Sequence, residues 1–228
     1  MASPKAYDQP TLNGAWEAFV AHVPTILLIW IATAVISGLG FGVHVLITLV
    51  GLGVSGSASG GEQAIGLASA LGQLGQLPFT VLSSLVGVLF VAVPALHYDG
   101  GEVITVQAAF AALMRRPLRY LLAGVLFTLV LAVGFLLCIV PGIVVALVMP
   151  IYVNRIFLTD QSITEAFSAS FQAVYRSERG RTFAGIEILA WLVVVVVSVC
   201  TCGLGALLAV PVSSFYLQNA AYNKGVIS

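Results

Sequence analysis

The sequence predicts an all-α integral membrane protein whose six transmembrane helices form three hairpins. Of the 228 residues, 60% are hydrophobic and 8% are charged, against roughly a quarter charged in soluble domains; mean hydropathy is +1.07. The apolar residues form long uncharged runs, and a bilayer core needs roughly 20 such residues per helix. The basic residues all fall on one side of the predicted layout. Too few polar groups remain to cover a water-facing surface, which excludes a soluble enzyme, a disordered chain and a nucleic-acid binder.

The uncharged runs give the spans in order. The run 24–54 is predicted as one long, tilted helix that overshoots the outer face, followed by an outer loop at 55–76. Pro141-Gly142 is a turn dipeptide, so we expect a tight hairpin turn there, and a second turn at 203–205. Five spans result if the last segment is only half inserted. The remaining predicted spans are 77–98, 118–141, 142–155 with a continuation to 158, 183–202 and 207–222.

The distribution of charged residues predicts the orientation. All basic residues lie on one side of the predicted membrane, and on the opposite side the only charge is Glu62. The positive-inside rule therefore places both termini in the cytoplasm. No signal-peptide pattern precedes the first run, and we expect a bacterial cytoplasmic (inner) membrane, with a photosynthetic membrane also compatible. The basic residues are Lys5, Arg115, Arg116, Arg119, Arg155, Arg176, Arg179, Arg181 and Lys224.

A threefold parallel repeat is predicted within a single domain, 1–228, with units at about 11–98, 103–158 and 162–224. An (E/A)-A-F-x-A core at 17–21, 108–112 and 165–169 precedes each odd-numbered span. The alternative is that alanine-rich interfacial helices resemble one another anyway. Each even-numbered span carries a proline, which removes a backbone hydrogen bond and is expected to kink its helix. The three kinks either line a polar pocket or serve helix packing only. These prolines are Pro94, Pro150 and Pro211.

Each repeat unit is expected to begin with an amphipathic cytoplasmic helix at the membrane interface. Ser162 and Glu165 form a predicted capping box, followed by an apolar stripe of Phe167, Phe171 and Val174 that suits the membrane surface. The arginines near these helices are candidates for contact with anionic lipid headgroups; the alternative is that they only set the topology. They are Arg115, Arg116, Arg119, Arg176, Arg179 and Arg181.

Three polar residues within predicted spans are candidates for a transport or polar site: Glu187, His44 and Asn154. An intramembrane carboxylate suggests a proton or cation site. His44 is a weak candidate ligand for haem or a pigment, and a neutral histidine bonded to a neighbouring helix is the preferred interpretation. A haem held between His22 and His97 is a further alternative.

The cysteines lie near the outer ends of two predicted helices. Cys138 can form a disulfide with Cys200 or Cys202 if those helices touch; the alternative is buried free thiols. Cys-Thr-Cys is too short for a zinc site. No metal, cofactor or catalytic residue is predicted, because no nucleophile, base and oxyanion hole assemble in any known pattern.

Part of the sequence resembles the YciC-like bacterial multi-pass membrane proteins, which are related to the membrane domain fused to some glycerophosphodiester phosphodiesterases. The motifs are Ile139-Val140-Pro141-Gly142-Ile143, Ser162-x-x-Glu165-Ala166-x-x-x-Ser170, Val210-Pro211, Ala221-Tyr222 and Ala15-Trp16-Glu17-Ala18-Phe19. The resemblance implies a six-helix inner-membrane protein and supplies no catalytic or binding residues. Phosphodiesterase activity is not expected.

The function predicted is that of a non-enzymatic scaffold or accessory subunit of a membrane complex. Its Gly/Ala-rich helix faces and interfacial helices suit contact with lipids and with other membrane proteins or further copies of the chain. One alternative is a small-solute or lipid transporter with a path between the three hairpins. A second alternative is a pigment- or haem-binding membrane protein.

Overall fold

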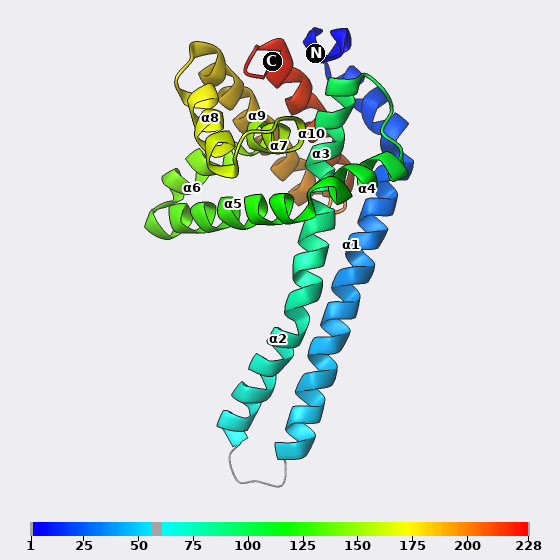
Figure 1. The fold of residues 1–228 in the computed structure, drawn as a ribbon, viewed down its shortest axis with the longest axis vertical. Helices are drawn as coiled ribbons and strands as arrows, with labels where there is room; N and C mark the ends of the chain where they lie inside the picture. Colours follow the sequence, from blue (N-terminus) through cyan, green and yellow to red (C-terminus); the bar gives the residue numbers. More distant parts are fainter. Residues whose placement is uncertain (1, 56–60, 228) are drawn as a thin grey trace. The chain divides into compact units, whose positions relative to one another are not determined.

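A computed structural model describes residues 2–55 and 61–227, and every regular element in these ranges is helical (Figure 1). The predicted all-α class is therefore confirmed. The elements are a short 3-10 helix η1 (Pro4–Tyr7) and the helices α1 (Leu12–Ser55), α2 (Gly61–Gly87), α3 (Leu89–Gly100), α4 (Val106–Arg115), α5 (Pro117–Leu137), α6 (Ile139–Ala146), α7 (Met149–Leu158), α8 (Ile163–Tyr175), α9 (Glu178–Cys200) and α10 (Ala206–Asn223).

Among the described residues, five helical segments are long and apolar enough to cross a membrane. This finding supports a membrane protein. The sixth predicted span corresponds to α10, which does not belong to this set because its second half is rich in polar residues. The five segments are Leu12–Gly53, Ile65–Gly100, Pro117–Leu137, Ile139–Leu158 and Glu178–Cys200.

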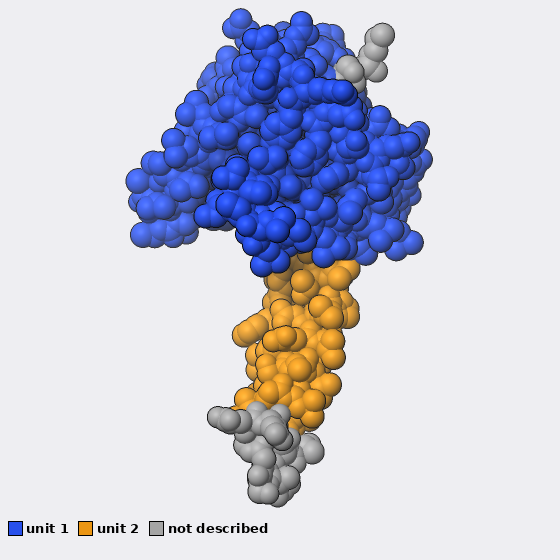
Figure 2. All heavy atoms as spheres, turned by 90° about the vertical axis from the view of Figure 1, so that its left-hand side faces the viewer, with its two compact units in different colours: residues 1–26, 88–228 blue, residues 27–87 orange. Residues whose placement is uncertain are grey.

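The chain divides into two compact units (Figure 2). Unit 1 comprises Met1–Ile26 and Val88–Ser228, and unit 2 comprises Leu27–Gly87. The boundaries of these two units do not coincide with those of the three predicted repeat units.

The first predicted span is one continuous helix, as expected, but it begins earlier than predicted. Helix α1 has 44 residues, which corresponds to about 66 Å at 1.5 Å per residue. Pro24 lies inside it. The expected interfacial helix of the first repeat unit is therefore continuous with the span and is not a separate element.

The predicted outer loop at 55–76 is wrong over most of its length, because α2 begins at Gly61. Pro78, the second residue of the predicted span 77–98, lies in the interior of α2. Gly72 and Gly75 of this segment serve packing. A Cβ atom built at Gly72 would lie 2.5 Å from Thr48 Oγ1 and 2.9 Å from the His44 backbone oxygen. The side chain of Glu62 lies outside the described residues.

Unit 2 is an antiparallel hairpin of the α1 segment from Leu27 onward and α2. Its register follows from three pairs of positions. Ser37 Oγ and Ser83 Oγ are 2.8 Å apart in a hydrogen bond, Gly40 faces Phe79, and Gly51 faces Ala68. Small residues along both helices allow this close approach of the backbones.

In unit 1, α10 packs against α9, α3 and α7, and α3 also packs against α7. Helix α8 lies against α9 and α7, while α5 pairs with α6. The fully buried core includes Phe183, Phe215 and Tyr222. The second half of α10, from Pro211 onward, is therefore largely buried within unit 1, where its polar side chains find partners.

The apolar stripe of α8, expected to lie on the membrane, contacts other helices of unit 1, while Phe167 and Phe171 remain half-buried. Val174 is fully buried, and the Phe167 ring lies 5.6 Å from the Tyr152 ring and 6.3 Å from the Phe127 ring. The predicted capping box is confirmed: Ser162 Oγ accepts from the Glu165 backbone N–H, and Glu165 Oε2 accepts from the Ser162 backbone N–H at 2.9 Å.

The turn predicted at Pro141-Gly142 lies instead at Cys138, whose backbone is extended with φ −174° and ψ 159°. Pro141 occupies the first turn of α6, where its missing N–H leaves no hydrogen bond unmade. Gly142 is needed for close packing, because a Cβ atom built there would lie 2.5 Å from Phe135 Cγ.

The three prolines expected to kink their helices occupy different positions. The predicted fourth span is interrupted between α6 and α7, and Pro150 lies at the start of α7. Pro94 lies inside α3, after the break at Val88 that separates α2 from α3. Pro211 lies inside α10, which continues through it.

Candidate functional site

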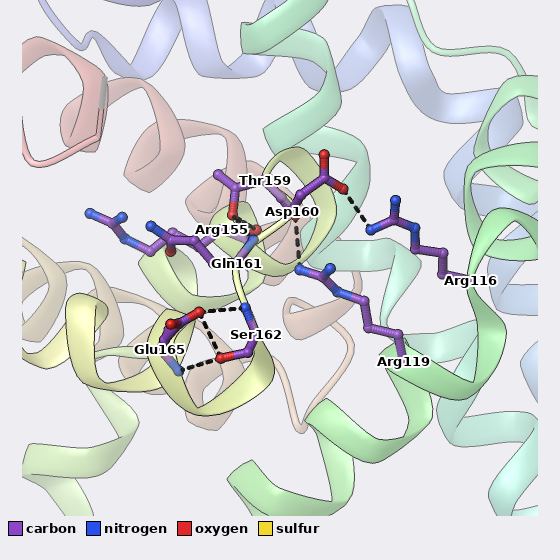
Figure 3. Close-up of polar contacts among 8 residues, drawn as sticks. All are labelled: Arg116, Arg119, Arg155, Thr159, Asp160, Gln161, Ser162 and Glu165. Atoms are coloured by element: carbon purple, nitrogen blue, oxygen red, sulfur yellow. Dashed lines mark hydrogen bonds and ion pairs between the residues drawn. The ribbon is translucent and has the colours of Figure 1, made fainter.

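Three basic side chains lie beside the segment 159–161 between α7 and α8, and we call them the basic cluster: Arg115, Arg116 and Arg119. Arg116 and Arg119 reach toward Asp160 and Thr159, whereas Arg155 points away from them (Figure 3). Arg116 Nη1 lies 2.6 Å from Asp160 Oδ1, and Arg119 Nη2 donates to the Thr159 carbonyl oxygen at 2.8 Å.

Local sequence places these groups. Thr159 Oγ1 donates to the Arg155 carbonyl oxygen at 2.7 Å and closes the end of α7. Pro117 begins α5 immediately after Arg116, so the arginines leave the first turn of that helix. The capping box then fixes the start of α8. Hydrogen bonds from the Ser162 hydroxyl and backbone N–H lower the pKa of Glu165, which therefore stays ionised within the box.

The cluster holds more cationic donors than the protein satisfies. The buried Nε atom of Arg119 has no hydrogen-bond partner among the described residues. Arg116 is 52% exposed and Asp160 is 87% exposed, so their ion pair is water-accessible and weak. Beside it lies a cavity of about 210 Å³ that includes Arg115 and the Tyr120 ring, which stacks on Phe157 at 4.1 Å. This arrangement can hold an anionic group such as a phosphate.

The structure thus brings together three of the six predicted headgroup arginines: Arg115, Arg116 and Arg119. Arg179 instead lines a second cavity together with Lys224. Arg176 and Arg181 are exposed and belong to neither cavity.

Asn154, a predicted polar-site residue, belongs to a buried hydrogen-bond network. Its Nδ2 atom donates to Gln218 Oε1 and to the Tyr222 hydroxyl oxygen, both at 3.2 Å. Gln218 Nε2 donates in turn to the Pro150 carbonyl oxygen at 2.9 Å. This network joins α7 to α10, and its role is structural. Gln218 was overlooked because a single polar residue in an apolar run does not reveal its partner.

Glu187 is 1% exposed, and its Oε2 atom has no partner among the described residues. Among the described residues it forms no hydrogen bond with Asn154, and His44 lies in unit 2. Tyr175, at the end of α8, donates its hydroxyl to the Val144 carbonyl oxygen at 2.7 Å. Burial, and secondarily the charge of Glu187, raises the pKa of Tyr175 to about 12.

The histidines occupy two different environments. His22 Nδ1 bonds the Ala18 carbonyl oxygen at 2.7 Å, and its Nε2 accepts from the Ile104 N–H at 2.9 Å. Both ring nitrogens are therefore occupied, and a haem held between His22 and His97 does not fit, since their rings are only 4.7 Å apart. His44 Nδ1 is buried without a partner in the part of the chain that is described.

The predicted disulfide is absent: Cys138, Cys200 and Cys202 are all free and exposed, which also excludes buried thiols. The physical reason is that α5 pairs with α6, whereas α9 packs against α10 and α8. Within the ranges 2–55 and 61–227, no three His, Cys, Asp or Glu side chains are grouped to hold a metal ion. No protein-family model, curated protein or solved structure matches this chain.

Proposed function

We propose that this protein is a non-enzymatic scaffold or accessory subunit of a membrane complex, and that its basic cluster contacts phosphate-bearing lipids. The observation that supports it best is the basic cluster, where the exposed side chains of Arg115 and Arg116 line a cavity and the buried Nε atom of Arg119 lacks a partner within the described chain. Each Lys or Arg near an anionic membrane surface contributes about 1 kcal/mol of attraction. The resemblance to YciC-like membrane proteins is consistent with this role.

The topology proposed has six spans in three hairpins, related by a threefold parallel repeat, with both termini in the cytoplasm. Helix α10 has 18 residues, or about 27 Å, close to the thickness of a bilayer core of about 30 Å. Its neighbours α3, α7 and α9 cover its polar side chains, so it needs less apolar surface than a lipid-facing helix. The segregation of basic residues supports the orientation.

Purification from the native membrane in gentle detergent, followed by mass spectrometry, tests the proposal. We expect stoichiometric protein partners and anionic phospholipid. The double variant Arg115→Gln/Arg116→Gln should retain several-fold less anionic lipid, because both side chains are exposed at the cluster. Arg176→Gln/Arg181→Gln is the matched control. A chain that purifies without any protein partner contradicts the accessory role.

A transporter is the second candidate, supported by the buried and unpartnered carboxylate of Glu187. Proteoliposomes containing the wild type should then take up protons or small cations, and Glu187→Gln should abolish the uptake. Equal fluxes in both proteins contradict this candidate.

A further inference from the structure

A second cavity, of about 620 Å³, opens in unit 1 where η1, α9 and α10 meet. Its lining includes Tyr7, Glu178, Arg179, Thr182 and Lys224. The residues come from three parts of the chain, so no single helix end forms this cavity.

The cavity carries both signs of charge. Arg179 and Lys224 form no ion pair within the described residues, and Glu178 is the only carboxylate in its lining. With two cations and one anion, the lining has a net charge of +1. A phosphodiester carries one negative charge and suits the cations, and an ammonium group suits Glu178 beside the Tyr7 ring.

Hydrogen bonds from asparagine side chains fix the wall of the cavity formed by η1 and α10. Asn223 Nδ2 donates to the Tyr7 carbonyl oxygen at 3.0 Å, and Asn219 Nδ2 donates to the Ala6 carbonyl oxygen at 2.9 Å, which anchors η1 on α10. Gly225 has a left-handed φ of 65°, and Arg179 Nη1 lies 3.4 Å from the position of an added Cβ atom. Preorganisation of this kind lowers the entropic cost of binding a ligand.

The cavity lies at the depth expected for the lipid headgroups, just before the apolar part of α9. The apolar part of α9 begins at Phe183, four residues after Arg179, or about 6 Å along the helix axis. The headgroup region on each side of a bilayer is about 5–7 Å thick. A lipid phosphate at this level can reach Arg179 while its acyl chains stay beside α9.

We propose that this cavity binds the headgroup of an amine-bearing phospholipid, with its phosphate at Arg179 and Lys224 and its ammonium at Glu178. The inference rests on the proposed membrane function and names the lipid class for a site distinct from the basic cluster.

The test uses native mass spectrometry of the full chain with equimolar phosphatidylethanolamine and phosphatidylglycerol. We expect the ethanolamine lipid to bind preferentially. Arg179→Gln and Lys224→Gln should each weaken its binding about tenfold, as expected for a lost charge-assisted contact. Arg181→Gln, an exposed position outside the cavity, is the matched control and should change binding less than twofold. If Arg179→Gln fails to fold, Lys224→Gln carries the same test.

Glu178→Gln tests the amine contact directly. It should remove the preference for ethanolamine over glycerol headgroups while leaving phosphate-dependent binding in place. Equal effects of Arg179→Gln and Arg181→Gln, or no headgroup preference in the wild type, overturn the proposal. Displacement of the lipid by millimolar inorganic phosphate alone assigns the site to free phosphate and also overturns it. Protein partners that copurify equally with every variant show that the scaffold proposal stands independently.

Discussion

The hydrogen bonds between Ser162 and Glu165 make the start of α8 sensitive to acid. The folded pKa of Glu165 is lowered from its ordinary value of 4.5, so the ionised carboxylate stabilises the fold above that pH. This stabilisation is lost as the pH falls through the folded pKa. We expect Glu165→Gln to lower the melting temperature at pH 7 and to have progressively less effect below pH 4.5. Thermal unfolding across this range measures it, and a pH-independent difference contradicts it.

Asn154 is the donor on which the buried network depends. Asn154→Ala leaves Gln218 Oε1 and the Tyr222 hydroxyl oxygen without this donor. We expect a loss of about 1–3 kcal/mol in the free energy of unfolding. Unfolding of the purified protein in denaturant measures this loss. Gln172→Ala, whose side-chain hydrogen bond is exposed, is the control and should cost much less; equal losses in the two variants would contradict the structural role of Asn154.

At the scale of the elements, the pairing of α1 with α2 depends on the absence of a side chain at Gly72. A Cβ atom there meets Thr48 Oγ1 and the His44 backbone oxygen. Gly72→Ala should therefore destabilise the hairpin by about 1–3 kcal/mol through overpacking. Gly66→Ala, on the same helix with nothing within 4 Å, is the control.

Crosslinking provides the measurement for this hairpin. In a chain whose native cysteines are replaced by serine, Ser37→Cys and Ser83→Cys should form a disulfide, because the two Oγ atoms are 2.8 Å apart. We expect Gly72→Ala to slow this crosslinking and Gly66→Ala to leave it unchanged. Equal rates in all three chains would show that Gly72 does not set the helix spacing.

For the whole molecule, the native cysteines test the topology without any substitution. Cys138, Cys200 and Cys202 are exposed and lie at the helix ends opposite the basic residues, so a membrane-impermeant maleimide should label them from outside intact spheroplasts. Arg176→Cys in a cysteine-free chain should be labelled only after permeabilisation. The reverse pattern would invert the proposed orientation.

Sequence reasoning located the helices well and their ends less well. Uncharged runs and the Ser162 cap are local properties, so the start of α8 and the turn before α10 follow from a few adjacent residues. Glycines at 61–76 were interpreted as loop formers because nothing local distinguishes a flexible glycine from one that permits close packing. The arginines of the candidate site could be predicted from the sequence, but which of them lie together in space could not.

The sequence alone determined the all-helical class, the apolar segments and the segregation of charge, because each depends on the sum of neighbouring residues. Only the tertiary structure decided that Asn154 bonds Gln218 and Tyr222, which lie 64 and 68 residues away. It also decided that the cysteines stay apart and that Arg179 meets Lys224 in one cavity. Such pairings depend on the rotation and register of packed helices, which many distant contacts fix together.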